Sequence, residues 1–368
     1  MSDRARWRAG ACVARGGGVP GAHVGPGLGV PWANRRPGRD YHSGMARPRV
    51  FVTRRIPDEG LLAIGEACDL RTWEGELPPS RAELLEAVEG CDGILTLLTD
   101  RVDADLLDRA GPRLRVVSNY AVGYDNIDVA ACAARGIAVG NTPGVLTETT
   151  ADLAFALLAA SARRVAEGDR YVRAGRWLTW GPMLLLGPDL HGATLGIVGF
   201  GRIGQAMARR ATGFDMTVLY WSRTRLDPEQ EAQRNVAWAD LDDLLARSDF
   251  VSIHASLSPG TRHLIDAAAL RHMKPSAILV NTARGPIVDQ AALADALRRG
   301  VIAGAALDVT DPEPMAPDDP LAGLDQCLIV PHIGSASPAT RGRMARMAAA
   351  NLLAGVRGEP LPNPVLPG

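Results

Sequence analysis

Short apolar runs alternate with helical patterns from residue 50 onward. The first apolar runs lie at 50–53, 93–98 and 114–118, and helical patterns lie between them at 81–88 and 104–107. Short apolar runs separated by helices predict parallel strands that are buried on both faces. This part of the chain therefore predicts a small α/β unit with one parallel sheet.

The second half of the chain repeats this alternation on a larger scale. A long helical pattern at 148–171 comes first. Apolar runs that predict buried strands follow at 195–198, 216–221, 250–254, 277–281, 304–308 and 327–330. The last helical pattern, at 338–357, has no strand of its own, so we expect it to return to the first unit.

One of these strands leads into a glycine-rich turn. The run 195–198 continues into the sequence GFGRIG at 199–204, and a helical pattern follows at once. In a G-x-G-x-x-G turn, Gly199 would allow the sharp turn, Gly201 would let the backbone approach a pyrophosphate, and Gly204 would let the helix pack closely on the strand. The apolar strand before the motif and the helix after it supply the context of a phosphate site. The chain is therefore predicted to bind a dinucleotide.

The residues after the next strand bear on which dinucleotide is bound. NAD sites place an Asp or Glu about 20 residues after the glycines, to hold the ribose 2′-hydroxyl. This chain has Ser222, Arg223, Thr224 and Arg225 there, and Asp215 precedes the strand. A guanidinium binds a 2′-phosphate and a hydroxyl donates to it, so the pattern favours NADP(H), with NAD(H) as a possible second cofactor. Solvated surface arginines would give the same pattern.

These patterns predict the α/β class, with two doubly wound parallel-sheet domains. A Rossmann domain at 148–332 is predicted to be inserted into a flavodoxin-like substrate (lid) domain made of 47–147 and 333–368. The active site is expected in the cleft between them, at the carboxyl ends of the strands. Residues 1–46 are rich in Gly, Pro and Arg, and either they form a disordered extension or the chain starts at Met45.

The amino-acid composition argues against several other classes of protein. The chain has 40 Lys and Arg against 41 Asp and Glu, so no basic excess points to nucleic acid. The apolar runs are too short for membrane spans, and no secretory signal is evident. The five cysteines are scattered without C-x-x-C spacing, which argues against a disulfide framework or a zinc site. A reducing cytoplasm fits this usage, and no metal site is expected.

Several motifs, taken in order, resemble one known family. They are FVTRRIP at 51–57, AVGYDNID at 121–128, the glycine turn, NTARG at 281–285, LDVTDPEP at 307–314, PHIGSA at 331–336 and NLLAGVRGEP at 351–360. On these residues the chain resembles the D-isomer-specific 2-hydroxyacid dehydrogenases, and among them the glyoxylate/hydroxypyruvate reductase subgroup. The resemblance runs from residue 47 to about 364 and leaves out the first 46 residues.

The resemblance implies a catalytic set of Arg284, Glu313 and His332. Reduction of a 2-keto acid needs a hydride on the carbonyl carbon and a proton on its oxygen. His332 would donate that proton, and Glu313 would orient His332 and favour its charged form. Arg284 would bind the substrate carboxylate with its forked guanidinium. The backbone amides of Val122 and Gly123 would bind the same carboxylate.

The resemblance also assigns contacts around this set. Cofactor contacts fall to Arg202, Ile203, Thr282 and Asp308, besides the three glycines and Ser222, Arg223 and Thr224. Asp308 would hold the nicotinamide carboxamide. Ser335 and Trp180 would line the substrate pocket, with Trp180 in a segment similar to a loop that enters the neighbouring subunit. A Trp buried in a dimer interface would explain that segment equally well, and both interpretations predict a homodimer.

The predicted function is NADPH-dependent reduction of small 2-keto acids, glyoxylate to glycolate and hydroxypyruvate to D-glycerate. Ser256 and Thr310 match the reductase subgroup, where much of the family has Pro and Phe. Two alternatives stay open: an NAD-linked dehydrogenase of another D-2-hydroxy acid such as 3-phosphoglycerate, and a nucleotide-sensing protein similar to corepressors. A formate dehydrogenase is disfavoured, because enzymes of that type carry Gln where this chain has Glu313.

Overall fold

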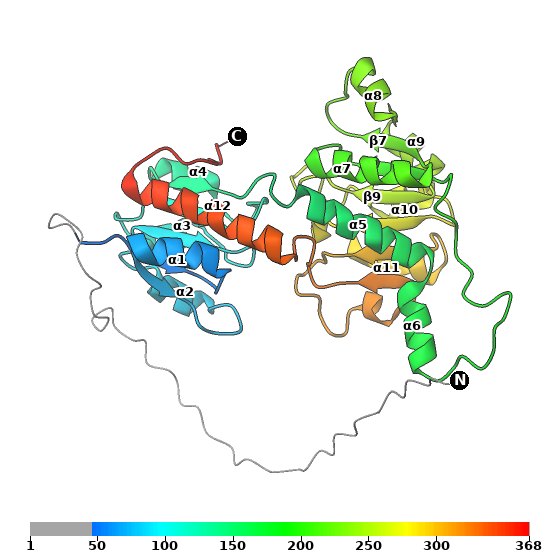
Figure 1. Ribbon diagram of the computed structural model, residues 1–368, viewed down its shortest axis with the longest axis horizontal. Helices are drawn as coiled ribbons and strands as arrows, with labels where there is room; N and C mark the ends of the chain where they lie inside the picture. The colour runs from blue at the N-terminus through cyan, green and yellow to red at the C-terminus, as the bar shows by residue number, and fades with distance from the viewer. Residues whose placement is uncertain (1–45, 368) are drawn as a thin grey trace, which may run out of the picture. The chain divides into compact units, whose positions relative to one another are not determined.

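The computed structural model describes residues 46–367, whose helices and strands are drawn in Figure 1. The prediction of a disordered extension at 1–46 falls almost entirely outside the described residues. The described chain contains two parallel sheets, of five and seven strands, each with helices on its faces. The α/β class with two doubly wound sheets is therefore confirmed.

The five-stranded sheet has the flavodoxin-like strand order β2-β1-β3-β4-β5. Its strands are β1 (Arg49–Val52), β2 (Asp69–Thr72), β3 (Gly93–Thr96), β4 (Val116–Asn119) and β5 (Ala138–Gly140). The helices that accompany it are α1 (Asp58–Ala67), α2 (Arg81–Ala87), α3 (Ala104–Ala110), α4 (Val129–Ala134) and α12 (Pro338–Arg357). Local capping starts several of them; Ser80 and Glu83, for example, form a reciprocal capping box at α2.

Helix α12 returns to this first sheet, as its lack of a following strand predicted. It packs against α1 and against β3 and β4, and Figure 1 shows it beside α1. Met344, Ala348 and Leu352 on its buried face join the core of the first sheet. The approach to α1 is close, because a Cβ added at Gly60 would lie 2.8 Å from the carbonyl oxygen of Ala345.

The seven-stranded sheet lies in the chain between β5 and α12. Its order is β12-β11-β10-β9-β6-β7-β8, so the direction of winding reverses between β6 and β9. The strands are β6 (Thr194–Val198), β7 (Thr217–Trp221), β8 (Val236–Trp238), β9 (Phe250–Ile253), β10 (Ile278–Asn281), β11 (Gly304–Leu307) and β12 (Cys327–Ile329). This is the Rossmann arrangement, in which ligands bind at the carboxyl ends beside the reversal.

Helices cover both faces of the seven-stranded sheet. On one face lie α5 (Thr147–Ala162) and α7 (Arg202–Ala211), and on the other lie α9 (Leu241–Arg247), α10 (Ala267–His272) and α11 (Gln290–Arg298). A further helix, α8 (Pro228–Arg234), precedes β8, and short 3₁₀ turns lie at Thr212–Phe214, Gly285–Ile287 and Pro320–Gly323. Within residues 46–367, no helix is both long and apolar enough to cross a membrane.

The structure corrects the predicted elements in two places. The helical pattern at 148–171 is two helices, because α5 ends at Ala162 and Arg164 adopts a left-handed conformation (φ 51°) before α6 (Val165–Arg173) begins. The strands β2, β5 and β8 were not predicted. All three are short edge strands, which carry no long apolar run for periodicity to detect.

Candidate active site

The glycine turn after β6 has the geometry that its motif requires. Gly199 has φ 96°, and a Cβ there would overlap the backbone of His254 and Ala255. A Cβ at Gly204 would overlap the carbonyl oxygen of Gly199, so the helix packs tightly on the turn. A Cβ at Gly201 would meet no atom within 4 Å. The middle glycine therefore presents open backbone at the start of α7, as a pyrophosphate would need.

A buried hydroxyl without a partner among the described residues lies at the end of β10, two strands from β6 in the sheet. Thr282 follows β10 directly, and its Oγ1 is buried without a hydrogen-bond partner among the described residues. Leaving such a group unpaired costs free energy, which a bound polar ligand would recover. Arg202 and Ile203 lie in the first turn of α7, beside the open face of Gly201. The chain thus fits a dinucleotide at the reversal of strand order.

The two arginines in the loop after β7 have different environments. Arg225 donates to both carboxylate oxygens of Glu231, at 2.8 and 2.9 Å, so it is committed to an ion pair. Arg223 is exposed and has no ion-pair partner in the part of the chain that the structure describes. The Ser222 hydroxyl donates to the Thr224 carbonyl within the same loop. Arg223 is therefore the available cation at this strand end, and Arg225, which the sequence grouped with it, is not.

Asp308 supports the turn that carries His332. It follows β11, and its two carboxylate oxygens accept from the backbone N–H groups of Ile333 (2.6 Å) and Gly334 (2.8 Å). Burial raises the pKa of Asp308, although these amide donors and nearby His332 act in the opposite direction. The structure thus shows a supporting role for the carboxylate, and its predicted contact with the nicotinamide stays a prediction.

His332 and Glu313 form a hydrogen-bonded pair. The imidazole Nδ1 lies 2.5 Å from Glu313 Oε1, and the histidine side chain is 26% exposed. The backbone of His332 is left-handed (φ 52°), a conformation held in part by its N–H bond to the Asp308 carbonyl oxygen (3.0 Å). Because the carboxylate takes Nδ1, the other ring nitrogen, Nε2, is left available to a ligand. The residues at 313 and 332 are thus brought together as predicted.

Arg284 is held by its own strand and contacts the other half of the chain. Asn281, the last residue of β10, donates to the Arg284 carbonyl (2.9 Å) and accepts from the Ala283 N–H (3.0 Å). The guanidinium donates from Nε to Asp125 Oδ1 at 3.0 Å. A Cβ added at Gly123 would overlap the same guanidinium. Asp125 and Asn281 were not predicted as site residues, because no periodicity marks side chains that hold a loop.

Two backbone amides lie beside this guanidinium. The N–H groups of Val122 and Gly123 make no hydrogen bond within residues 46–367, whereas both carbonyl oxygens of this pair accept one. Ser335 is buried two residues beyond Ile333. Trp180, by contrast, is 77% exposed. The structure therefore brings Arg284 to the 122–123 amides, and the predicted place of Trp180 in the neighbouring subunit's pocket stays a prediction.

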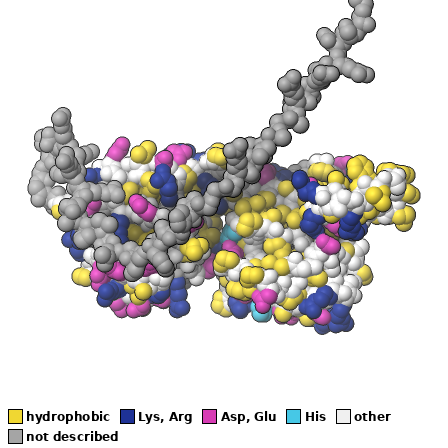
Figure 2. Space-filling model, turned by 90° about the horizontal axis from the view of Figure 1, so that it is seen from below, with side chains coloured by type: hydrophobic (Ala, Val, Ile, Leu, Met, Phe, Trp, Pro, Cys, Tyr) yellow, Lys and Arg dark blue, Asp and Glu magenta, His cyan; other side chains and the backbone are white. Residues whose placement is uncertain are grey.

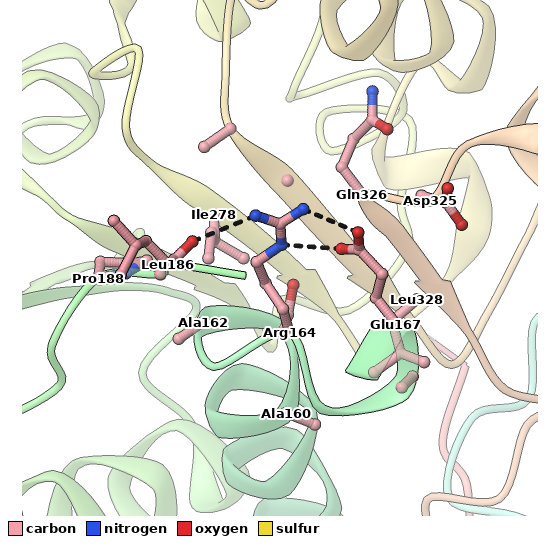
Figure 3. Close-up of a pocket in the computed structure, with 15 residues that line it drawn as sticks. Ala160, Ala162, Arg164, Glu167, Leu186, Pro188, Ile278, Asp325, Gln326 and Leu328 are labelled. Atoms are coloured by element: carbon pink, nitrogen blue, oxygen red, sulfur yellow. Dashed lines mark hydrogen bonds and ion pairs between the residues drawn. The ribbon is translucent and has the colours of Figure 1, made fainter. Parts of the chain in front are cut away.

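A cavity of about 340 Å³ lies elsewhere, at the amino ends of β10 and β11. Its lining includes Ile278 and Gly304, the first residues of those strands. Figure 3 shows the guanidinium of Arg164 in this cavity, paired with Glu167 and with the Leu186 carbonyl. Arg164 and Glu167 satisfy each other, and Asp325 is paired with Arg170. Since its charged groups are thus paired and it lies at the opposite ends of the strands, it is not the dinucleotide site.

Comparison with known proteins decides the family. Residues 155–334 match the family described as "D-isomer specific 2-hydroxyacid dehydrogenase, NAD binding domain". A glyoxylate reductase of Korarchaeum cryptofilum is 55% identical over 318 residues, covering 86% of this chain and 95% of that protein. The chain belongs to the D-isomer-specific 2-hydroxyacid dehydrogenase family. It is thus an NAD(P)-dependent oxidoreductase.

Solved structures of similar chains agree. The TT0316 protein of Thermus thermophilus superposes with a TM-score of 0.81 at 49% identity, covering 86% of this chain and all of that one (100%). An NADPH-dependent glyoxylate/hydroxypyruvate reductase of Sinorhizobium meliloti, solved with NADP and malonate, has a TM-score of 0.77 at 34% identity and covers 87% and 97%. The family resemblance found in the sequence motifs is therefore confirmed.

Proposed function

We propose that this dehydrogenase reduces small 2-keto acids, glyoxylate to glycolate and hydroxypyruvate to D-glycerate, with NADPH as its preferred cofactor. The observation that carries the proposal is the His332–Glu313 pair at 2.5 Å, a proton donor with its orienting carboxylate at the ends of two strands. The glyoxylate reductases of Korarchaeum cryptofilum and Thermococcus litoralis, 55% and 49% identical, support the substrate class.

The proposed catalytic residues are His332, Glu313 and Arg284, each with a distinct task. The bound nicotinamide supplies the hydride. His332 donates a proton from Nε2 to the keto oxygen as negative charge develops there. Glu313 keeps the proton of the other ring nitrogen on Nδ1 and stabilises the imidazolium before transfer. The proton leaves Nε2 for the product hydroxyl, so the imidazole ends the reaction neutral.

The substrate carboxylate is proposed to lie between Arg284 and the free N–H groups of Val122 and Gly123. A carboxylate accepts four or more hydrogen bonds, and this arrangement offers two amide donors beside a guanidinium. Binding of this end fixes the position of the keto carbon, and Ser335 is proposed to line the same pocket. A 2-keto acid is held in this way and an isolated ketone is not, which gives the substrate class.

The preference for NADPH is proposed from Arg223. An exposed guanidinium that has no partner within residues 46–367 follows β7, where a carboxylate would select NAD. A 2′-phosphate pairs with such a guanidinium and is repelled by a carboxylate. The reductase of Sinorhizobium meliloti, 34% identical, was solved with NADP. Thr282, Asp308 and the first turn of α7 are proposed to complete the cofactor contacts.

A homodimer is proposed from unpartnered apolar side chains. Helix α6 buries none of its residues, although Val165 and Val172 are large hydrophobics. The segment that follows exposes Trp177, Leu178 and Trp180. In the view of Figure 2, hydrophobic side chains lie exposed over the half that holds the seven-stranded sheet. Aromatic residues are enriched at interfaces, and a second copy of the chain would cover them.

The domain division at 147/148 and 332/333 and a cytoplasmic location are likewise proposals.

The proposed function is tested by measuring initial rates. Purified protein is assayed with NADPH and with NADH against glyoxylate, hydroxypyruvate, 3-phosphohydroxypyruvate and pyruvate. We expect the highest kcat/KM for glyoxylate or hydroxypyruvate. Absence of turnover with all four keto acids would overturn the proposal and favour a nucleotide sensor.

A further inference from the structure

Two consecutive main-chain carbonyls close to Arg284 are each held by a hydrogen bond. The Ala121 carbonyl accepts from the backbone N–H of Thr142 at 2.8 Å, and the Val122 carbonyl accepts from Asn141 Nδ2 at 2.8 Å. Residues 141 and 142 directly follow β5, so one short segment holds two consecutive peptide planes. The free N–H groups of Val122 and Gly123 belong to these same two planes.

These two hydrogen bonds determine the directions in which the Val122 and Gly123 N–H groups point. In a trans peptide the N–H points opposite to the C=O of the same plane. The bond to Thr142 therefore turns the Val122 N–H away from segment 141–142, and the bond to Asn141 does the same for the Gly123 N–H. Both donors therefore point away from segment 141–142, and the Arg284 guanidinium lies close against Gly123, whose N–H is one of them.

Asn141 is itself held firmly. It is buried, its backbone N–H donates to the Asn363 carbonyl (3.2 Å), and its carbonyl accepts from Asn351 Nδ2 (2.8 Å). Asn351 is fully buried in α12, and its Oδ1 accepts from the Asn363 N–H at 2.9 Å. The C-terminal part of the chain, which returns to the first sheet, therefore holds Asn141 in place. Asn141 in turn holds the Val122–Gly123 peptide.

We infer that Asn141 is a positioning residue for the substrate carboxylate, acting through the orientation of the Gly123 N–H. This inference rests on the proposed function, since it needs a carboxylate between Arg284 and the two amides. Without the Nδ2 donor, the part-buried Val122 carbonyl loses its partner, and the peptide plane can rotate to find another one. The Gly123 N–H then turns out of the site while Arg284, His332 and the cofactor contacts stay in place.

The test replaces the donor with an acceptor of the same shape. In Asn141→Asp the carboxylate oxygen lies where the amide N–H was, and it repels the Val122 carbonyl. We expect KM for glyoxylate to rise about tenfold, the scale of one lost hydrogen bond to a charged group, while the dissociation constant for NADPH stays within twofold. The inhibition constant of oxamate, whose carboxylate takes the same place, rises in parallel.

Two further variants keep the test decisive. Asn141→Ser removes the reach to Val122 without adding charge, and serves if the Asp variant does not fold. Asn235→Asp makes the same chemical change at the exposed C-cap of α8, and its KM should equal that of the parent. An unchanged KM and oxamate constant in a folded Asn141→Ser protein overturns this inference. If the parent itself shows no keto-acid turnover that depends on Arg284, the proposed function fails instead, and the inference falls with it.

Discussion

Arg284 donates from Nε to Asp125 Oδ1 at 3.0 Å, which joins a loop of the seven-stranded sheet to a loop of the five-stranded one. The two side chains are 20% and 41% exposed, so the pair is only partly shielded from water and adds little stability by itself. The consequence of the pair is that it orients the Arg284 guanidinium. With Nε on Asp125 and Nη1 on the Ala283 carbonyl, Nη2 is directed toward Gly123.

The first prediction follows from the different neighbours of the three guanidinium nitrogens. In Arg284→Lys, one ammonium replaces donors that point in three directions, so it cannot serve Asp125 and a substrate carboxylate together. We expect KM for glyoxylate to rise, kcat to fall, and kcat/KM to drop about 10²-fold, the scale of truncating a charged contact. NADPH affinity should stay unchanged. Arg247→Lys, in an exposed pair with Asp243, is the matched control and should keep the parent kinetics.

The second prediction concerns cofactor choice. We expect kcat/KM to be at least about tenfold higher with NADPH than with NADH, a difference of about 1.4 kcal/mol. Arg223→Asp should reverse the preference, because its carboxylate repels a 2′-phosphate and accepts from a 2′-hydroxyl. Arg225→Gln should alter the ratio by less than about threefold, since Glu231 already occupies that guanidinium. Equal use of both cofactors by the parent protein would remove the assignment of Arg223.

Much of the fold could be predicted because its signals are local. The apolar run before the glycines and the glycines themselves specify the β6 turn, and the structure gives each of Gly199, Gly201 and Gly204 its expected environment. The return of α12 was also predictable, because a helix without a strand must bury its apolar face elsewhere. Both inferences need only periodicity and the known freedom of glycine.

The rest depends on contacts between distant residues. Asp125 lies 159 residues from Arg284, and Asn351 lies 210 residues from Asn141, so no pattern in the sequence connects them. Arg225 looked equivalent to Arg223 until Glu231, on α8, was seen to take it. Likewise the break in the 148–171 pattern depends on a single left-handed residue, Arg164, which helix periodicity does not reveal.

The third prediction concerns thiol reactivity. Burial raises the pKa of Cys68 and Cys132 to about 11 and that of Cys91 to about 12, so at pH 8 these groups are neutral thiols rather than thiolates. In the folded protein carrying Cys12→Ser and Cys327→Ser, these three thiols should react with a disulfide reagent at least about 10²-fold more slowly than a free cysteine. Guanidinium chloride should restore the normal rate. Fast reaction of any of the three in the native protein would contradict the burial seen here.

The last prediction rests on the contact of 2.5 Å between His332 and Glu313. If His332 donates the proton to the keto oxygen, its removal should slow reduction itself and leave cofactor binding intact. His332→Ala should lose at least about 10²-fold in kcat, with NADPH affinity unchanged.

In Glu313→Gln kcat for reduction should also fall, by less than in His332→Ala. The carboxylate lies against the ring that donates the proton, and a neutral amide gives less support to the positive charge that this ring carries before transfer. The amide still accepts from Nδ1, so orientation is kept and the loss of kcat reports charge alone. Glyoxylate kinetics of the parent and both variants decide the matter: a His332→Ala protein within a few-fold of the parent would remove the mechanism, and an unchanged kcat in Glu313→Gln would remove Glu313 from it.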